Sequence, residues 1–220
     1  MKIKSIFTRS GTRTIDNQDV VVAFIHGGCS FSMVLDGCSQ RSRSGEFANA
    51  FAGLFEIEVK KLKLKESSLK GIIECMFTIF QYVHKDLRMD FSAAAFSFML
   101  VIEREGIGLV FHLGDCGLGR LNRSGNVTWV SKPHTLLKLP MRKLQKNPAR
   151  HILNKSFKAK RYAAPEYFIM AFRPRALFII ASDGFWGDMS PCEQKRLLSS
   201  KHPVDSCSDD DLSFIVLENR

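Results

Sequence analysis

The sequence predicts an α+β protein in which antiparallel β-sheets pack against helices. Two observations predict this fold class: strand-like segments come in runs, and a pair of helical segments separates those runs instead of single helices alternating with single strands. The chain has 220 residues, of which 45% are hydrophobic and 25% are charged. A chain of this size can bury one large core without disulfides or a structural metal, so we expect a single domain.

The first elements expected along the chain are a β-hairpin and two helices. The β-branched segment 20–26 ends at a Gly-Gly pair, and the apolar segment 31–35 follows at once and leads to Asp36. Apolar residues then recur at helical spacing from position 47 to 55, and again from 72 to 87. These spacings predict two amphipathic helices after the hairpin.

Four further strands are expected in the middle of the chain, at positions 93–102, 107–113, 118–121 and 127–130. Because these strands are consecutive and separated by turns, we expect them to form an antiparallel meander.

Three elements are expected toward the end of the sequence. An apolar strand covers 176–181, and a final strand covers 212–217. Between them, Ser190 and Glu193 form a capping-box pattern that predicts a helix from about Pro191 to Leu198.

The charge of the chain is strongly positive and unevenly distributed. Lys and Arg number 32 against 22 Asp and Glu, which gives a net charge of +10 and favours a polyanionic partner such as nucleic acid, anionic lipid or a phosphorylated protein. No acidic residue lies between Asp115 and Glu166, and basic residues crowd positions 138–161. This basic segment either attracts an acidic partner or is simply a solvated loop.

The cysteines and the N-terminus bear on cellular location. Cysteine stands at positions 29, 38, 75, 116, 192 and 207, with no Cys-x-x-Cys pair and no zinc-like spacing, so we expect reduced thiols in a cytoplasmic protein. The first 16 residues contain no apolar core, and no run of 18 apolar residues occurs, so neither a secretory signal nor a membrane span is expected.

Four aspartates stand at the ends of expected strands. Asp36 and Asp183 each follow an apolar strand and precede a glycine, Asp115 follows the strand at 107–113, and Asp210 precedes the last strand. Any one of them alone is typical of a turn. Four together can converge above a sheet, where their oxygens would suit Mg²⁺ or Mn²⁺.

These residues lie in motifs that resemble the metal-dependent serine/threonine protein phosphatase 2C (PPM) family, in its compact bacterial form. In chain order the matching segments are Asn-Gln-Asp (17–19), Val-Leu-Asp-Gly (34–37), Ser-Ala-Ala-Ala (92–95), Leu-Gly-Asp-Cys (113–116), Ala-Ser-Asp-Gly-Phe-Trp (181–186) and Asp-Asp-Leu-Ser (210–213). The resemblance implies an αββα sandwich of two antiparallel β-sheets flanked by helix pairs. It also implies one phosphatase-like catalytic domain over 1–220, with a flap-like basic segment at about 138–161.

The resemblance further implies a binuclear Mn²⁺ or Mg²⁺ centre. In such a centre Asp36 would bridge both ions, the Gly37 carbonyl would complete one site, and Asp183 and Asp210 would ligate the other ion. Asp19 would orient a metal-bound water that hydrolyses phosphoserine or phosphothreonine.

The resemblance suggests roles for further residues. Arg13 would bind the substrate phosphate, because a guanidinium can hold two phosphate oxygens, and Arg9 competes for this role. Asp115 and Asp188 could hold a third ion. The substrate would be a phosphorylated protein, and the partner implied for compact bacterial members is an opposing Ser/Thr kinase.

The sequence also departs from the family pattern. Gln18 stands where the family usually has Glu, Cys38-Ser39-Gln40 replaces a glycine-rich loop, and Gly187 stands where a metal-binding Asp often follows Trp. These departures leave open a catalytically weakened protein that only binds a phosphorylated partner. We expect His134 and His151 to be hydrogen-bonded loop residues rather than metal ligands.

A basic nucleic-acid-binding module is a third and weaker hypothesis. Within the basic segment and just beyond it, only Phe157 and Tyr162 could stack on bases. No membrane partner is expected.

Overall fold

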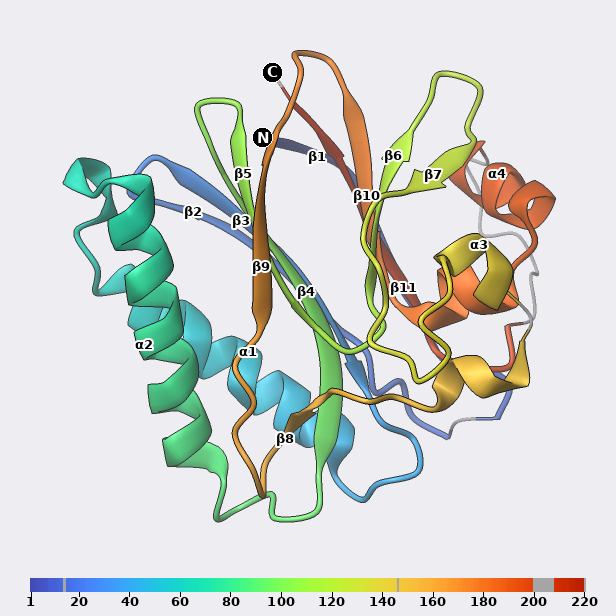
Figure 1. The fold of residues 1–220 in the computed structure, drawn as a ribbon, viewed down its shortest axis with the longest axis horizontal. Coiled ribbons are helices and arrows are strands. Elements are labelled where there is room, and N and C mark those ends of the chain that lie inside the picture. The colour runs from blue at the N-terminus through green and yellow to red at the C-terminus, as the bar shows by residue number, and fades with distance from the viewer. Residues whose placement is uncertain (14, 146, 200–207, 220) are drawn as a thin grey trace.

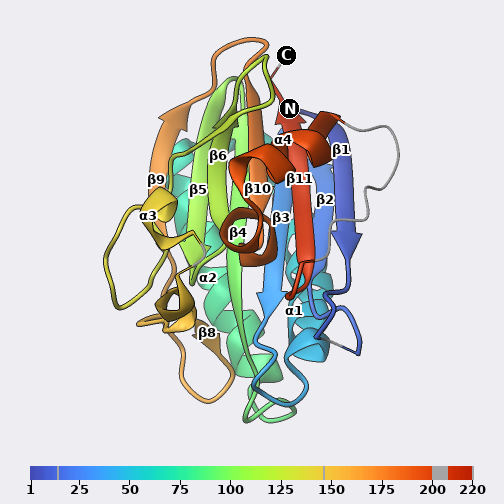
Figure 2. The same cartoon turned by 90° about the vertical axis from the view of Figure 1, so that its right-hand side faces the viewer.

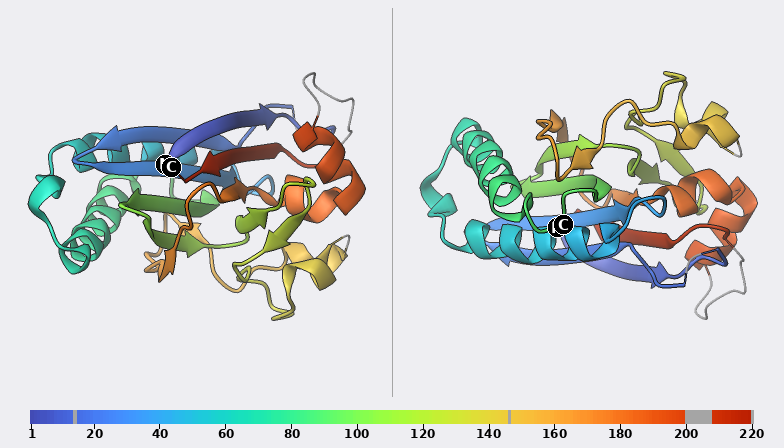
Figure 3. Two further views of the ribbon diagram at one scale, coloured as in Figure 1. Left: turned by 90° about the horizontal axis from the view of Figure 1, so that it is seen from above. Right: turned by 90° about the horizontal axis from the view of Figure 1, so that it is seen from below.

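The computed structural model describes residues 1–13, 15–145, 147–199 and 208–219. Two antiparallel β-sheets lie face to face between two layers of helices (Figure 1). The same four layers are visible from above and from below in Figure 3. This arrangement confirms the predicted α+β class and the αββα sandwich.

The first sheet carries the two long helices on its outer face. Its strand order is β2 (Val20–His26), β3 (Cys29–Gly37), β4 (Ala95–Arg104), β5 (Ile107–Leu113) and β9 (Glu166–Ala171), with β8 (Phe157–Lys158) paired to β4. The helices are α1 (Ser44–Lys60) and α2 (Leu69–Leu87), with the short helix η1 (Leu64–Glu66) between them. Their apolar faces bury a core of phenylalanines against the sheet, including Phe51, Phe80 and Phe98.

The central strands of this sheet are buried on both faces, which explains their continuous apolar sequence. In β4, Phe98 and Leu100 point toward α1 and α2, whereas the alternate residues Met99 and Val101 point toward the second sheet. The inner layer between the sheets is completed from the other side by Ile180.

The second sheet has the strand order β1, β11, β10, β6 and β7. Its strands are β1 (Lys2–Arg9), β6 (Gly117–Leu121), β7 (Val127–Trp129), β10 (Leu177–Ala181) and β11 (Leu212–Glu218). On its outer face lie α4 (Pro191–Ser199), α3 (Met141–Leu144) and the π-helical turn η3 (Gly184–Asp188), as Figure 2 shows. The remaining short helix is η2 (Pro148–His151).

Most of the expected elements are confirmed. The strand expected at 20–26 and the strand expected at 107–113 have those bounds in the structure, and the capping box of α4 forms: the Ser190 N–H donates to Glu193 Oε2 at 2.6 Å. The expectation of one meander over 93–130 is wrong. The chain leaves the first sheet after β5 and crosses to the second, so β6 pairs with β10 and β7 instead of β5.

A close backbone approach allows this crossing. Gly114 has a φ of 101°, and a Cβ at this position would lie 2.1 Å from Ser97 Oγ, so only glycine fits there. The other strands that the sequence did not predict, β1, β8 and β9, either lie at sheet edges or are two residues long. Among the described residues, no helix is long and apolar enough to cross a lipid bilayer.

Candidate metal-binding site

The aspartates singled out in the sequence meet at one end of the sandwich. Asp36 is the second-last residue of β3, Asp183 follows β10, and Asp210 precedes β11. In antiparallel sheets the end of one strand lies beside the beginning of its neighbour, so residues at opposite ends of adjacent strands come together. Asp19 precedes β2 and Asp115 follows β5. Both belong to the same cluster, because the charge of each raises the pKa of Asp36.

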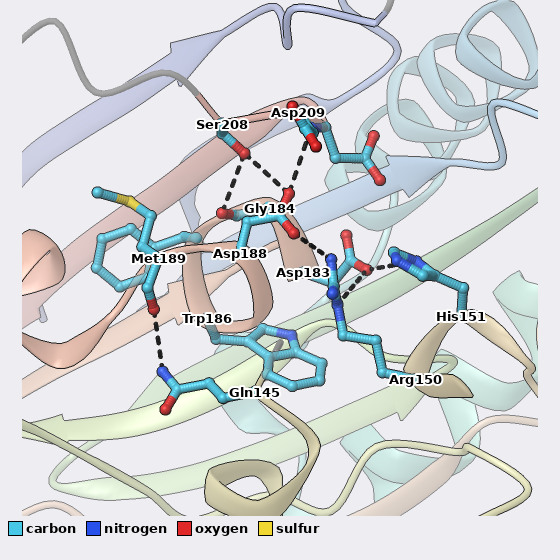
Figure 4. A network of polar contacts seen from close by, with 12 residues as sticks. Gln145, Arg150, His151, Asp183, Gly184, Trp186, Asp188, Met189, Ser208 and Asp209 are labelled. Atoms are coloured by element: carbon cyan, nitrogen blue, oxygen red, sulfur yellow. Dashed lines mark hydrogen bonds and ion pairs between the residues drawn. The ribbon is translucent and has the colours of Figure 1, made fainter. Parts of the chain in front are cut away.

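The carboxylates of Asp183 and Asp210 come closest to an arrangement that could hold an ion. Together with His151, they place one ligand atom each within 4.8 Å of one another. The His151 Nδ1 lies 3.2 Å from Asp183 Oδ2 (Figure 4). A Cβ at Gly184 would lie 2.0 Å from the Asp211 carbonyl oxygen, so glycine at this position lets the β10 turn approach the start of β11.

The electrostatics of the cluster favour a cation. Burial raises the pKa of Asp36 well above its usual range, and the charges of Asp19 and Asp183 raise it further. Burial and Asp183 likewise raise the pKa of Asp115 to about 7 and that of Asp210 to about 6. Burial and neighbouring negative charge both oppose the ionisation of these carboxylates. A bound divalent ion would stabilise their ionised form and lower their pKa values.

Asp19 supplies the clearest sign that something is to be bound here. Both of its carboxylate oxygens are buried, and neither makes a hydrogen bond within the described parts of the chain. Burial raises the pKa of Asp19 well above its usual range, an effect partly offset by the nearby hydroxyls of Ser182 and Ser213. A buried carboxylate without a hydrogen bond is costly unless a water or an ion satisfies it. The residues present therefore fit a hydrated divalent cation.

The neighbouring loops are held by contacts that also orient the cluster. Asp211 accepts hydrogen bonds from the backbone N–H of Gln18 at 2.7 Å and of Gly11 at 2.9 Å, which ties the segment before β2 to the start of β11. The Trp186 indole donates to the Asp115 carbonyl at 2.8 Å, which fixes the crossing between the sheets. The Trp186 contact gives the Ser-Asp-Gly-Phe-Trp segment a structural role beside the cluster.

The two residues suggested for a third ion differ in their surroundings. Asp115 is buried beside Asp183, whereas the Asp188 carboxylate already has partners on both oxygens. Its Oδ1 contacts the Arg150 guanidinium, and its Oδ2 accepts hydrogen bonds from Ser208 Oγ at 3.1 Å and the Asp210 N–H at 3.3 Å. Arg150 was not singled out as a site residue, because an arginine in a basic segment gives no signal that it is buried.

Arg13 lies beside the cluster but points to solvent. Its side chain is 76% exposed, and its Nη2 lies 2.6 Å from Asp209 Oδ2, next to Asp210. The Arg13 N–H also donates to the Asp209 carbonyl at 3.2 Å.

Gly37 packs against Gln18, since a Cβ there would lie 2.8 Å from the Gln18 carbonyl oxygen.

A second group of potential ligands, the histidine cluster, lies apart from the carboxylate cluster of Asp19, Asp36, Asp115, Asp183 and Asp210. His112 lies in β5, Glu166 begins β9, and His134 lies in the loop between β7 and α3. His112, His134 and Glu166 place ligand atoms within 4.8 Å of one another, and the two imidazole rings stack with centroids 4.7 Å apart. The Gly114 N–H donates to His134 Nδ1 at 3.0 Å, and His134 Nε2 lies 3.3 Å from Glu166 Oε1. Glu166 also pairs with Lys155. His134 therefore has a backbone hydrogen bond at one ring nitrogen and a carboxylate beside the other.

Comparison with known proteins was made at the level of sequence and of structure. No protein-family model and no curated protein sequence matches this chain. Solved structures do match. A bacterial serine phosphatase superposes with a TM-score of 0.82 at 14% identity, covering 100% of this chain and 98% of that chain. The chain has the fold of the PPM serine/threonine phosphatases.

Two further phosphatases of this fold match over nearly their full length. The Staphylococcus aureus serine/threonine phosphatase has a TM-score of 0.79 at 16% identity, with 100% and 96% of the two chains covered. The PPM Ser-Thr phosphatase from Mycobacterium smegmatis, solved in complex with cacodylate, has a TM-score of 0.76 at 17% identity, with 100% and 99% covered. The fold implied by the sequence motifs is thus confirmed by structures that share little sequence with this chain.

Proposed function

We propose that this protein is a metal-dependent phosphoprotein phosphatase that hydrolyses phosphoserine or phosphothreonine with a binuclear Mn²⁺ or Mg²⁺ centre. The observation that carries the proposal is the convergence of Asp19, Asp36, Asp183 and Asp210 at one end of a phosphatase-like sandwich. Their mutual charge and the unpartnered oxygens of Asp19 make this end of the single domain, 1–220, the natural place for cations.

Each residue has a definite task in this proposal. Asp36 and the Gly37 carbonyl would hold one ion, and Asp36, Asp183 and Asp210 would hold the other. When bound, two divalent ions supply Lewis acidity toward the phosphate and lower the pKa of water. Asp19 orients the attacking water, because its buried oxygens are free to accept that hydrogen bond.

The phosphate and the leaving group require further groups. Arg13 extends into solvent beside Asp209, from which it can turn to pair with a phosphate, since that exposed ion pair is weak. The residue directly after Asp36-Gly37 is Cys38 and not a histidine, so solvent water would protonate the leaving alkoxide.

The charge of the chain suggests the kind of substrate. The net charge of +10 and the basic segment at 138–161 favour an acidic phosphorylated segment of another protein as the substrate. The phosphatase would then act in signalling, in opposition to a Ser/Thr kinase. The described cysteines are all free thiols, which suits a reducing compartment, and we place the protein in the cytoplasm.

The test is hydrolysis of p-nitrophenyl phosphate and of phosphoserine and phosphothreonine peptides by the purified chain with Mn²⁺, Mg²⁺ or EDTA. We expect turnover with metal and none with EDTA. The Asp183→Asn variant should lose turnover, whereas Asp86→Asn, an exposed helix position, should retain it. Full activity in EDTA or in Asp183→Asn would refute the proposal. A folded protein that binds the phosphopeptides without turnover would instead indicate the binding-only alternative.

A further inference from the structure

Arg150 is a buried arginine inside the carboxylate cluster. It lies in η2, within the basic segment, yet only 5% of its surface is exposed, unlike the exposed Arg142 and Lys143 of the same segment. Its Nη2 contacts Asp188 Oδ1, and its Nε lies 3.6 Å from Asp183 Oδ2 (Figure 4). The guanidinium thus stands between two acidic residues of the turn that follows β10.

The contacts of Arg150 are those of a counter-ion. A buried guanidinium is retained only when carboxylates compensate for its lost hydration. Here the Nε makes no hydrogen bond within the described residues, so its attraction to Asp183 is a charge contact across 3.6 Å. On the other side, Asp188 Oδ2 accepts a hydrogen bond from the backbone N–H of Asp210. Arg150 therefore joins the turn after β10 to the segment before β11.

Gly187 provides the space for this arginine. A Cβ at position 187 would lie 2.5 Å from the Arg150 Nε and 3.0 Å from its Cδ. Any side chain at position 187 would displace the guanidinium from its place beside Asp183. The volume next to Asp183 can hold a side chain at 187 or the guanidinium of Arg150, but not both.

We propose that Arg150 is a built-in cation that takes the place of a divalent ion on the Asp188 side of Asp183. Metal ions then bind only on the Asp36 and Asp210 side of the cluster, and no ion binds between Asp115 and Asp188. The inference rests on the proposed function for the existence of a metal centre, and it does not depend on turnover.

The experiment counts Mn²⁺ ions bound per chain by isothermal titration calorimetry at neutral pH. The variants are Arg150→Ala and, as a control from the same basic segment, the exposed Arg142→Ala. We expect wild type and Arg142→Ala to bind the same number of ions. Arg150→Ala should bind one more, and the double variant Arg150→Ala/Asp188→Asn should lose the additional ion. An unchanged number in folded Arg150→Ala would overturn the inference.

A second variant keeps the test decisive if Arg150→Ala does not fold. In Asp188→Asn, with Arg150 intact, we expect the same number of bound Mn²⁺ ions as in wild type, since Asp188 holds the guanidinium and no metal. A loss of one bound ion would make Asp188 a metal ligand and overturn the inference. The proposed function fails separately, if wild type binds no Mn²⁺ at all. A first ion gained in Arg150→Ala would then still support the role of Arg150.

Discussion

The carboxylate cluster and the histidine cluster show that closeness of ligand atoms does not by itself indicate a metal site. Both clusters bring three such atoms within 4.8 Å. In the histidine cluster the backbone N–H of Gly114 occupies the lone pair of His134 Nδ1, so the neutral ring carries its proton on the Nε2 that faces Glu166. The lone pair that a metal would need is therefore not available on His134.

The pKa shifts of the two clusters run in opposite directions. In the histidine cluster, Lys155 lowers the pKa of Glu166 to about 2, because the carboxylate already has a cation beside it. In the carboxylate cluster, burial and like charge raise the pKa of Asp115 to about 7 and also raise that of Asp36. In the histidine cluster, Lys155 balances the negative charge of Glu166. In the carboxylate cluster, the positive charge of Arg150 does not balance the charges of the aspartates.

The largest effect should come from removing the carboxylate shared by both proposed ions. We expect Asp36→Asn to lower kcat/KM for p-nitrophenyl phosphate at least about 1,000-fold, because several kcal/mol of transition-state stabilisation by metal would be lost. Glu166→Gln, in the histidine cluster, is the matched control and should retain activity. If the two variants lost activity equally, the distinction between the clusters would be wrong.

A smaller effect is expected on the stability of the metal-free protein. The pKa of Asp115 is raised in the folded state, so its ionisation opposes folding, and stability falls as pH rises from about 4 to about 7. Asp115→Asn removes this cost. In EDTA at pH 8 the variant should be more stable than wild type by on the order of 1–3 kcal/mol, with the difference shrinking toward pH 5.

Urea unfolding at pH 8, 6 and 5 measures this difference. Because buried histidines such as His112, whose pKa is lowered to about 4, have the opposite pH dependence, the difference between variant and wild type is the informative quantity. Asp86→Asn controls for net charge. A difference that did not change with pH would mean that Asp115 is not held in its neutral form.

The smallest effect should come from the exposed ion pair of the histidine cluster. The pKa of Glu166 is lowered in the folded state, so its contribution to stability is present above pH 4.5 and is lost as pH falls toward 2. Because Glu166 is about half exposed, Glu166→Gln should cost less than about 1 kcal/mol at pH 7. Thermal unfolding at pH 7 and pH 3 checks this, and a cost that grew at pH 3 would contradict it.

The sequence predicted the fold class and the locations of the aspartates, because both depend on local patterns. An apolar run such as β10 ends at a polar residue, which must lie where the strand leaves the sheet. Asp183 is such a residue. The sheet to which a strand belongs depends on distant partners. The sequence around Gly114 therefore did not show that β5 and β6 lie in different sheets.

Arg150 illustrates the same limit within the site. Its sequence neighbours place it in a solvated basic segment, and only the space beside Gly187 explains its burial. The edge strand β1 was missed because none of its residues is buried and its alternation of Lys and Ile carries little apolar signal. The positions of the carboxylates could thus be predicted, whereas the charge that balances them could not.

The pairing of β1 with β11 has a consequence for how the protein is made. Lys2 lies opposite Glu218, and β11 stands between β1 and β10 in the second sheet. During synthesis on the ribosome, β1, β6 and β10 must wait for β11 before this sheet can close. Such long-range pairing gives a high contact order and slow folding. Asp210, which precedes β11, reaches the other aspartates only when β11 joins the sheet, so the carboxylate cluster assembles late in folding.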